Sequence, residues 1–161
     1  MAEWSPLIKA AATANGIEPT LLAAVILQES SNNPWAIRFE WGFYNKYVKG
    51  KTRETLQGHV PPERICSVQS EKFARAYSWG LCQLMGQTAR ENGLITEFVS
   101  ELLKPELNIF IGAKVLRRKI DQARGNITGG LLLWNGGGNK DYPSQVLEKQ
   151  SNGLAAKLLE D

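Results

Sequence analysis

Residues 21–38 read LLAAVILQESSNNPWAIR, an apolar helix that stops at a polar corner. Leu22, Val25 and Ile26 have the spacing of one helix face. Glu29 follows Val25 by four positions and Ile26 by three, so the last turn carries a carboxylate on the same, inward face. Four polar residues and a proline then end the helix. The sequence therefore places an acid where its most hydrophobic helix breaks.

A carboxylate at this helix end has an unusual electrostatic environment. Partial burial disfavours the anion, and so does the negative end of the helix dipole, so both effects predict a raised pKa for Glu29. A raised pKa is what a general acid needs near neutral pH. Ser30 and the asparagines after it are candidates to orient the carboxyl group. A solvated glutamate at a frayed helix end is the alternative interpretation.

Turn and capping residues predict helices along most of the remaining chain. They are expected over 6–14, with Ser5 as the N-cap, and over 19–30, 71–78, 86–93, 96–103, 105–124, 129–134 and 142–149. The longest of them keeps an approximate helical period in its apolar residues, which are Leu107, Phe110, Ile111, Val115 and Ile120.

The stretch of about 35–69 differs from the rest. It is rich in aromatic residues and contains a Pro61-Pro62 pair, so a short hairpin or an irregular lobe fits better than a long helix. A chain of 161 residues is long enough for one domain with a sizeable core. We therefore expect a single, mainly α domain over 1–161, with one inserted lobe at about 35–69.

Composition and charge argue against several classes of protein. The formal net charge is +3 and the basic residues are dispersed, which disfavours a nucleic-acid partner. The longest apolar run is too short to span a membrane. Cys66, Cys82 and His59 match no metal-ligand spacing, so neither a metal nor another cofactor is expected. A disulfide stays open, although Cys82 lies in an apolar run that favours a buried thiol.

Three further motifs follow ESSNNPWA in chain order. They are YSWGLCQLMGQTAREN at 77–92, LLLWNGGG at 131–138 and YPSQVLE at 142–148. The ordered set resembles the SLT-type lytic transglycosylases of the lysozyme-like superfamily. In that family an E-S pair ends a buried helix, and a G-L-M-Q segment, an A-Y-N-x-G turn and a late tyrosine follow. The resemblance spans most of the chain and implies a helical fold of the goose-type or SLT kind.

The resemblance also implies roles for the matching residues of the first two motifs. Glu29 matches the catalytic acid of the family, and Ser30 matches its hydroxyl neighbour. Gly80, Leu81 and Gln83 match the segment that forms a wall of the glycan cleft. They are expected to bind substrate.

The two later motifs supply the remaining matches and include departures from the family pattern. Asn135 matches the asparagine of A-Y-N-x-G, and Tyr142 matches the tyrosine beside the acid. Trp134 stands where the family has a tyrosine, Cys82 where it has a methionine and Gly86 where it has a proline. These departures concern the shape of the cleft, to which Trp134 is also expected to contribute.

By resemblance, the substrate is the glycan strand of peptidoglycan, cleaved at the β-1,4 bond between N-acetylmuramic acid and N-acetylglucosamine. Such cleavage needs an acid that protonates the leaving oxygen. In lytic transglycosylases the C6 hydroxyl of muramic acid then attacks internally, and the same glutamate serves as base, which yields a 1,6-anhydro product. Goose-type lysozymes, which hydrolyse the bond, carry an Asp after this segment, where this chain has Met85 and no acid. That difference favours the transglycosylase.

Glu40 keeps a second enzymatic interpretation open. The stretch IRFEWGFY, at 37–44, resembles an R-[FY]-E segment of some phage and bacterial muramidases, which share the S-W-G-L-x-Q-x-M-G pattern of 78–86. Glu40 is then the second carboxylate of a hydrolase, a residue of the cleft, or the partner of Arg38 in an ion pair. A non-catalytic glycan-binding module is a third interpretation, and the inward acid Glu29 speaks against it.

The resemblance implies a protein that acts on the bacterial cell wall. Residues 1–16 show no pattern of a secretory signal, so the chain is expected to be mature or to leave the cell by another route. Together with the inserted lobe, this suggests a phage-related protein. We expect it to act as a monomer.

Overall fold

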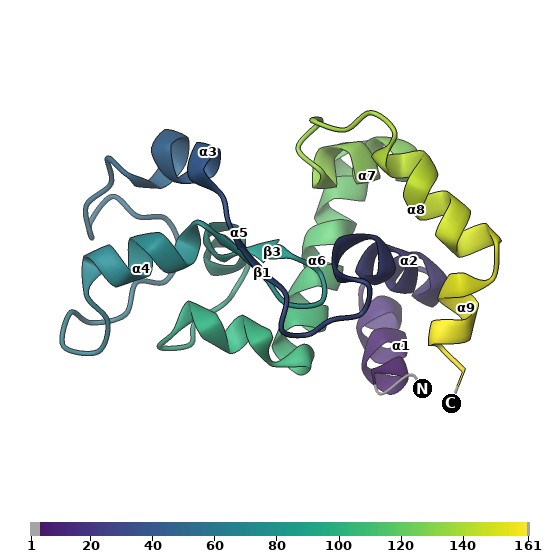
Figure 1. The fold of residues 1–161 in the computed structure, drawn as a ribbon, viewed down its shortest axis with the longest axis horizontal. Helices are drawn as coiled ribbons and strands as arrows, with labels where there is room; N and C mark the ends of the chain where they lie inside the picture. Colours follow the sequence, from purple (N-terminus) through teal and green to yellow (C-terminus); the bar gives the residue numbers. More distant parts are fainter. Residues whose placement is uncertain (1–3, 161) are drawn as a thin grey trace. The chain divides into compact units, whose positions relative to one another are not determined.

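The structure is a computed structural model that describes residues 4–160. It is mainly helical, as the sequence predicts, with one small sheet (Figure 1). The helices are α1 (Ser5–Ala14), α2 (Pro19–Ser30), α3 (Trp41–Phe43), α4 (Val68–Arg75), α5 (Gly86–Glu91), α6 (Pro105–Gln122), α7 (Ile127–Trp134), α8 (Tyr142–Ser151) and α9 (Leu154–Leu158). A π-helix η1 (Tyr44–Val48), a 3-10 helix η2 (Val99–Leu103) and the strands β1 (Ile37–Phe39), β2 (Tyr77–Trp79) and β3 (Leu84–Met85) complete the described elements.

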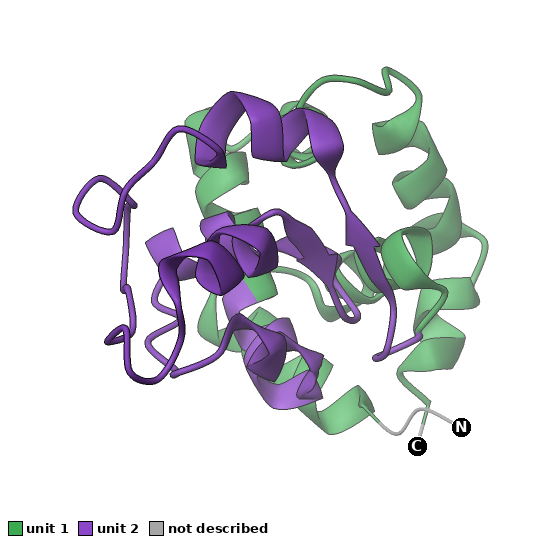
Figure 2. Cartoon of the chain, turned by 60° about the vertical axis from the view of Figure 1, so that its left-hand side comes forward, with its two compact units in different colours: residues 1–32, 112–161 green, residues 33–111 purple. Residues whose placement is uncertain are grey.

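The chain divides into two compact units (Figure 2). Unit 1 comprises residues 1–32 and 112–161, and unit 2 comprises residues 33–111. The chain passes from one to the other after Asn32 and again within α6. The lobe expected at about 35–69 belongs to unit 2. The expectation that 1–161 form one catalytic domain stays a prediction.

Helix α2 is the centre of unit 1. Residues 21–26 are buried on every side, and α1, α8 and α9 pack against this helix (Figure 1). A helix that is buried all round has apolar residues all round, which explains why LLAAVI lacks a polar face. Complete burial ends at Ile26, and the last turn, 27–30, is half-buried. Ser31 then ends the helix in a left-handed conformation with a φ of 52°.

Unit 2 contains the sheet, in the antiparallel order β1-β2-β3. The lobe is irregular, as predicted, but its strand β1 forms no local hairpin. Ile37 pairs with Trp79 and Phe39 pairs with Tyr77, across some forty residues of sequence. A small buried cluster of unit 2 is formed by residues that lie between β1 and β2 in the sequence, namely Tyr44, Val48, Leu56 and Ala76.

Two of the expected helices differ most from the prediction. The expected helix 71–78 lies at Val68–Arg75, because Tyr77 and Ser78 pair with β1 instead of continuing α4. The expected helix 96–103 is reduced to the 3-10 turn η2. At Tyr77 and Ser78 the pairing with a distant strand overrides the local pattern.

Three further details were not predicted correctly. Ser5 is the first residue of α1 and not its cap, and its hydroxyl donates to the Leu159 carbonyl over 2.9 Å. Phe110, placed in the apolar period of the longest helix, is 56% exposed. Helix α9 was not predicted at all.

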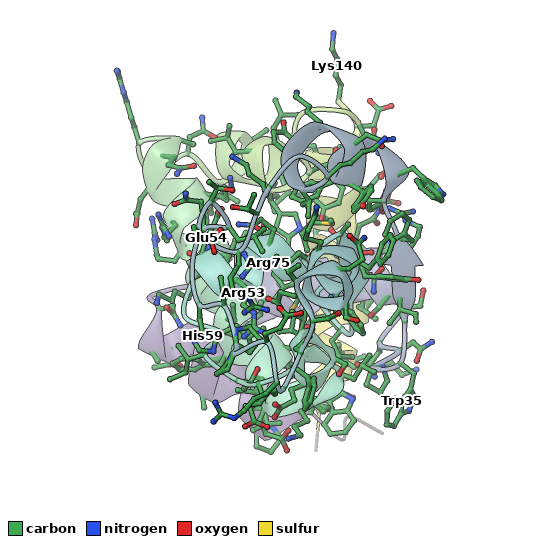
Figure 3. All side chains as sticks on the ribbon, turned by 90° about the vertical axis from the view of Figure 1, so that its left-hand side faces the viewer. Trp35, Arg53, Glu54, His59, Arg75 and Lys140 are labelled. Atoms are coloured by element: carbon green, nitrogen blue, oxygen red, sulfur yellow. The ribbon has the colours of Figure 1, made fainter. Side chains whose placement is uncertain are left out.

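A buried ionic network lies in unit 2. The Glu71 carboxylate accepts from Arg75 Nε over 2.9 Å and from Arg90 Nε over 2.8 Å, and all three side chains are fully buried. Arg75 also donates to the carbonyls of Gln57 and His59. Figure 3 labels His59 and Arg75, which lie in the same region of unit 2. The network thereby ties α4 and α5 to the irregular segment of the lobe.

Candidate functional site

Glu29 lies in the last turn of α2, and two aromatic side chains hold its carboxyl group. Trp134 Nε1–H donates to Glu29 Oε1 over 2.8 Å, and the Tyr142 hydroxyl donates to the same oxygen over 2.5 Å. Glu29 is half-buried, whereas Tyr142 is 3% exposed. All three residues belong to unit 1, so sequence positions more than a hundred residues apart meet at one carboxyl oxygen.

The two hydrogen-bond donors to Glu29 lie at the ends of two helices. Trp134 is the last residue of α7 and Tyr142 is the first residue of α8. In the loop between them, Asn135 Oδ1 accepts from the Asn139 backbone N–H over 2.9 Å. Gly136 and the glycine after it have positive φ angles, 74° and 78°, which a side chain would make costly. The motif WNGGG is therefore a turn that brings both donors to Glu29.

Two glutamines that the sequence reasoning missed stabilise this arrangement. Gln28 Nε2, on α2, donates to Gln145 Oε1, on α8, over 3.0 Å. Asn139 Nδ2 donates to the same oxygen over 3.3 Å. Gln28 directly precedes Glu29, and Gln145 lies within the motif YPSQVLE, which was the available signal for both. The amides link the loop, α8 and the end of α2.

Ser30 and its polar neighbours make hydrogen bonds of their own, and their expected role in orienting Glu29 stays a prediction. The Ser30 hydroxyl donates its hydrogen to the Ile26 carbonyl over 3.2 Å. Asn33 Oδ1 accepts from the backbone N–H of Trp35. Asn32 Oδ1 is buried without a hydrogen-bond partner. Trp134, at the end of α7, and Tyr142, at the start of α8, donate hydrogen bonds to the Glu29 carboxyl group.

The segment SWGLCQ forms a tight turn in unit 2. Gly80 and Gln83 both have left-handed backbones, with φ angles of 65° and 46°. Both hydrogens of the Gln83 side-chain amide are used inside unit 2, because Nε2 donates to the carbonyls of Ala36 (2.9 Å) and Gly80 (2.8 Å). Leu81 is completely buried. The Gln83 amide and the Leu81 side chain thus shape the turn, and their predicted contact with substrate stays a prediction.

Asn108 is a buried residue of α6 that the sequence reasoning did not single out. Its Nδ2 donates to the carbonyls of Trp79 and Leu102, and its Oδ1 accepts from the Cys82 N–H, each over 2.8 Å. A Cβ atom at Gly80 would lie 2.6 Å from Asn108 Nδ2, so glycine is needed there. Asn108 therefore stabilises the turn through hydrogen bonds to its backbone.

Glu40 is held in the ion pair that was one of its predicted roles. Its Oε1 accepts from Arg38 Nε over 2.6 Å, with the Arg38 side chain 75% exposed. Both residues lie in unit 2, Arg38 within β1 and Glu40 directly before α3. The roles of Glu40 as a second carboxylate or a residue of the cleft stay predictions.

Neither cysteine forms a disulfide within the described part of the chain, and Cys82 is a buried thiol as predicted. Residues 4–160 contain no group of His, Cys, Asp and Glu side chains placed to hold a metal ion. Over the same range, no helix combines the length and the apolar character that a membrane crossing requires.

A half-buried carboxyl group fixed by two aromatic donors is the kind of site that enzymes use for proton transfer. A family model described as "Transglycosylase SLT domain" matches residues 6–153. The chain therefore belongs to the transglycosylase SLT domain family, which confirms the family that its motifs indicate.

A curated relative comes from a bacteriophage. The protein named "Transglycosylase" of Enterobacteria phage PRD1 is 27% identical over 154 residues, which cover 91% of this chain and 42% of the phage protein. The chain thus spans about two fifths of the length of this relative. No solved structure matches the chain significantly.

Proposed function

We propose that this chain is a lytic transglycosylase that cleaves the β-1,4 bond between N-acetylmuramic acid and N-acetylglucosamine in peptidoglycan. The observation that carries the proposal is the pair of hydrogen bonds from Trp134 and Tyr142 to Glu29 Oε1. Membership of the SLT family and the likeness to a phage transglycosylase support the same substrate. The site of action is then the bacterial cell wall.

Glu29 is the general acid and then the general base of this proposal. Its Oε1 already accepts two hydrogen bonds, so the proton to be donated sits on Oε2. Transfer of this proton to the glycosidic oxygen breaks the bond to C1 of muramic acid, through an oxocarbenium-like transition state. The anionic Glu29 that remains is stabilised by its two donors.

The second half of the reaction needs no further carboxylate. The C6 hydroxyl of the same muramic acid attacks C1 and gives its proton back to Glu29, which closes the 1,6-anhydro ring. Internal attack replaces a second reactant, and a well-placed internal nucleophile lowers the barrier by several kcal/mol. The ion pair of Glu40 with Arg38 supports this one-carboxylate route over hydrolysis with two carboxylates.

The proposal is tested with Glu29→Gln on purified peptidoglycan. The amide keeps the size of the side chain but cannot donate the proton, so release of soluble fragments should fall below detection while the melting temperature stays unchanged. Glu18→Gln is the matched control, because Glu18 is an exposed glutamate before the first turn of the same helix. Wild-type lysis by the Glu29 variant would contradict the assignment.

The products decide between the two enzymatic routes. Mass spectrometry should find fragments that are lighter by one water than hydrolytic ones and that lack a reducing end. If reducing ends dominate, water is the nucleophile and Glu40→Gln should be nearly as damaging as Glu29→Gln. If Glu40→Gln retains activity, the one-carboxylate route stands.

A further inference from the structure

Unit 2 contains a cavity of about 360 Å³ that is built entirely from its own residues. The lining comes from the helical stretch α3–η1, the segment after it and α5. None of these residues belongs to the Glu29 site, and the motif comparison assigns the cavity no role. Its volume lies within the range of small-molecule sites.

One side of the cavity is aromatic. Phe43 and Tyr47 lie four residues apart on α3–η1, with ring centroids 4.9 Å apart. Phe43 is partly buried, and Tyr47 is 49% exposed. Two neighbouring rings, one of them half-exposed, form an apolar wall against which a flat, weakly polar face can pack.

The lining residues that come from α5 are polar, and hydrogen bonds hold Gln87 among them in place. Gln87 is 8% exposed, and its Oε1 accepts from Arg75 Nη1 over 2.9 Å. Its Nε2 donates to Glu91 Oε1 over 2.7 Å. Arg75 Nη1 also donates to the Gln57 carbonyl over 2.5 Å. The buried ionic network therefore fixes these polar groups before any ligand arrives, which lowers the entropic cost of binding.

The charges of the lining balance. Lys51 and Glu91 are the only lining residues that carry a charge at neutral pH, one cation and one anion, and hydroxyls and amides make up the other polar groups. A strongly anionic or cationic ligand gains nothing net from such a lining. A sugar ring matches it, because its C–H face packs on aromatic rings while hydroxyl and acetamido groups at its edge bond to carboxylates and amides.

We propose that this cavity is a second saccharide site, which binds uncharged N-acetylated sugar rings of a glycan strand between the aromatic wall and Glu91. The proposal rests on the proposed function for the identity of the polymer. A second site on the same chain raises the local concentration of an insoluble substrate without taking part in the chemistry.

The test follows binding residue by residue in the full chain carrying Glu29→Gln, with the tetramer of N-acetylglucosamine as the probe. Backbone amide resonances of 43–57 and 86–91 should shift and saturate. Adding Tyr47→Ala should weaken the affinity read from these resonances about fivefold or more. Phe98→Ala, which removes a half-exposed aromatic residue of unit 2 outside the cavity, should leave that affinity unchanged.

Glu91→Gln is the second variant, because Glu91 is exposed and its replacement should not disturb folding. It should weaken the same affinity about threefold. Absence of saturable shifts in these segments, or equal affinity of Tyr47→Ala and Glu91→Gln with the parent, would overturn the second site. So would shifts caused by a short dicarboxylic peptide but not by the tetrasaccharide.

Cleavage of peptidoglycan by the wild-type chain is measured in parallel. Cleavage without the expected shifts overturns the second site alone. Shifts without cleavage support the second site and overturn the proposed function.

Discussion

Replacing Glu71 by glutamine should destabilise the protein more than any surface charge change. Glu71 accepts three hydrogen bonds, from Arg75 Nε at 2.9 Å and from Arg90 Nε and Nη2 at 2.8 and 3.1 Å. Burial lowers the pKa of the Arg75 guanidinium from its ordinary value, and the charge of Glu71 opposes this effect. Glutamine keeps the shape but leaves two buried guanidinium groups without a counter-charge.

The size of the effect follows from this burial. Removing one partner of a buried ion pair costs about 3–5 kcal/mol, against a total stability of about 5–15 kcal/mol for a domain. For a chain of this length the loss lowers the melting temperature by about 6–20 °C. The glutamine NH₂ group would also face an arginine N–H, where two donors cannot bond.

Urea unfolding followed by far-ultraviolet circular dichroism measures the free energy directly. The matched control is Glu101→Gln, whose carboxylate pairs with Lys104 in a surface ion pair with side chains 28% and 62% exposed. Such a pair contributes about 0–1 kcal/mol. If Glu71→Gln loses less than about 1 kcal/mol, or no more than the control, the account of the buried network is wrong.

Two further substitutions and one thiol-labelling reaction test separate parts of the structure. Tyr142→Phe removes one of the two hydrogen bonds to Glu29 and should lower the rate of peptidoglycan cleavage about tenfold or more with little change in melting temperature, as scored by fragment release. Asn108→Ala leaves the Cys82 N–H without its acceptor and should lower the free energy of unfolding by about 1–3 kcal/mol in urea titrations. Burial raises the pKa of the Cys66 thiol, so less thiolate forms at pH 8 and iodoacetamide should label Cys66 more slowly than a cysteine peptide, as followed by mass spectrometry.

The sequence located the parts of the site that depend on local pattern. Helix α2, its end near Ser30 and the position of Glu29 follow from periodicity and a proline, and the structure has them at Pro19–Ser30. Tyr142 was found only through the order of the motifs, since nothing local marks it as a partner of Glu29. Its hydrogen bond joins positions 113 residues apart, which no short-range pattern encodes.

Neither the pairing of the strands nor the role of Asn108 could be predicted from local sequence patterns, because both depend on contacts between residues far apart in the sequence. Strands β1 and β2 have three residues each, too few for a clear alternating pattern, and their pairing is decided by tertiary contacts. Asn108 occupies a helix position that the apolar period does not mark. Its importance lies in three hydrogen bonds to distant backbone groups, which only the folded chain brings together.

Trp134 links a departure in the sequence to the chemistry of the site. The sequence comparison placed this tryptophan in the wall of a cleft, as a change of shape where the family has a tyrosine. In the structure its indole N–H donates to Glu29 Oε1. An indole N–H can only donate, whereas the hydroxyl of Tyr142 can donate or accept. Trp134 therefore donates to Oε1 in every protonation state of Glu29, whereas the Tyr142 hydroxyl can switch between donating and accepting. If Glu29 is the acid, as proposed, the hydrogen bond from Trp134 to Oε1 favours Oε2 as the oxygen of Glu29 that carries the acidic proton.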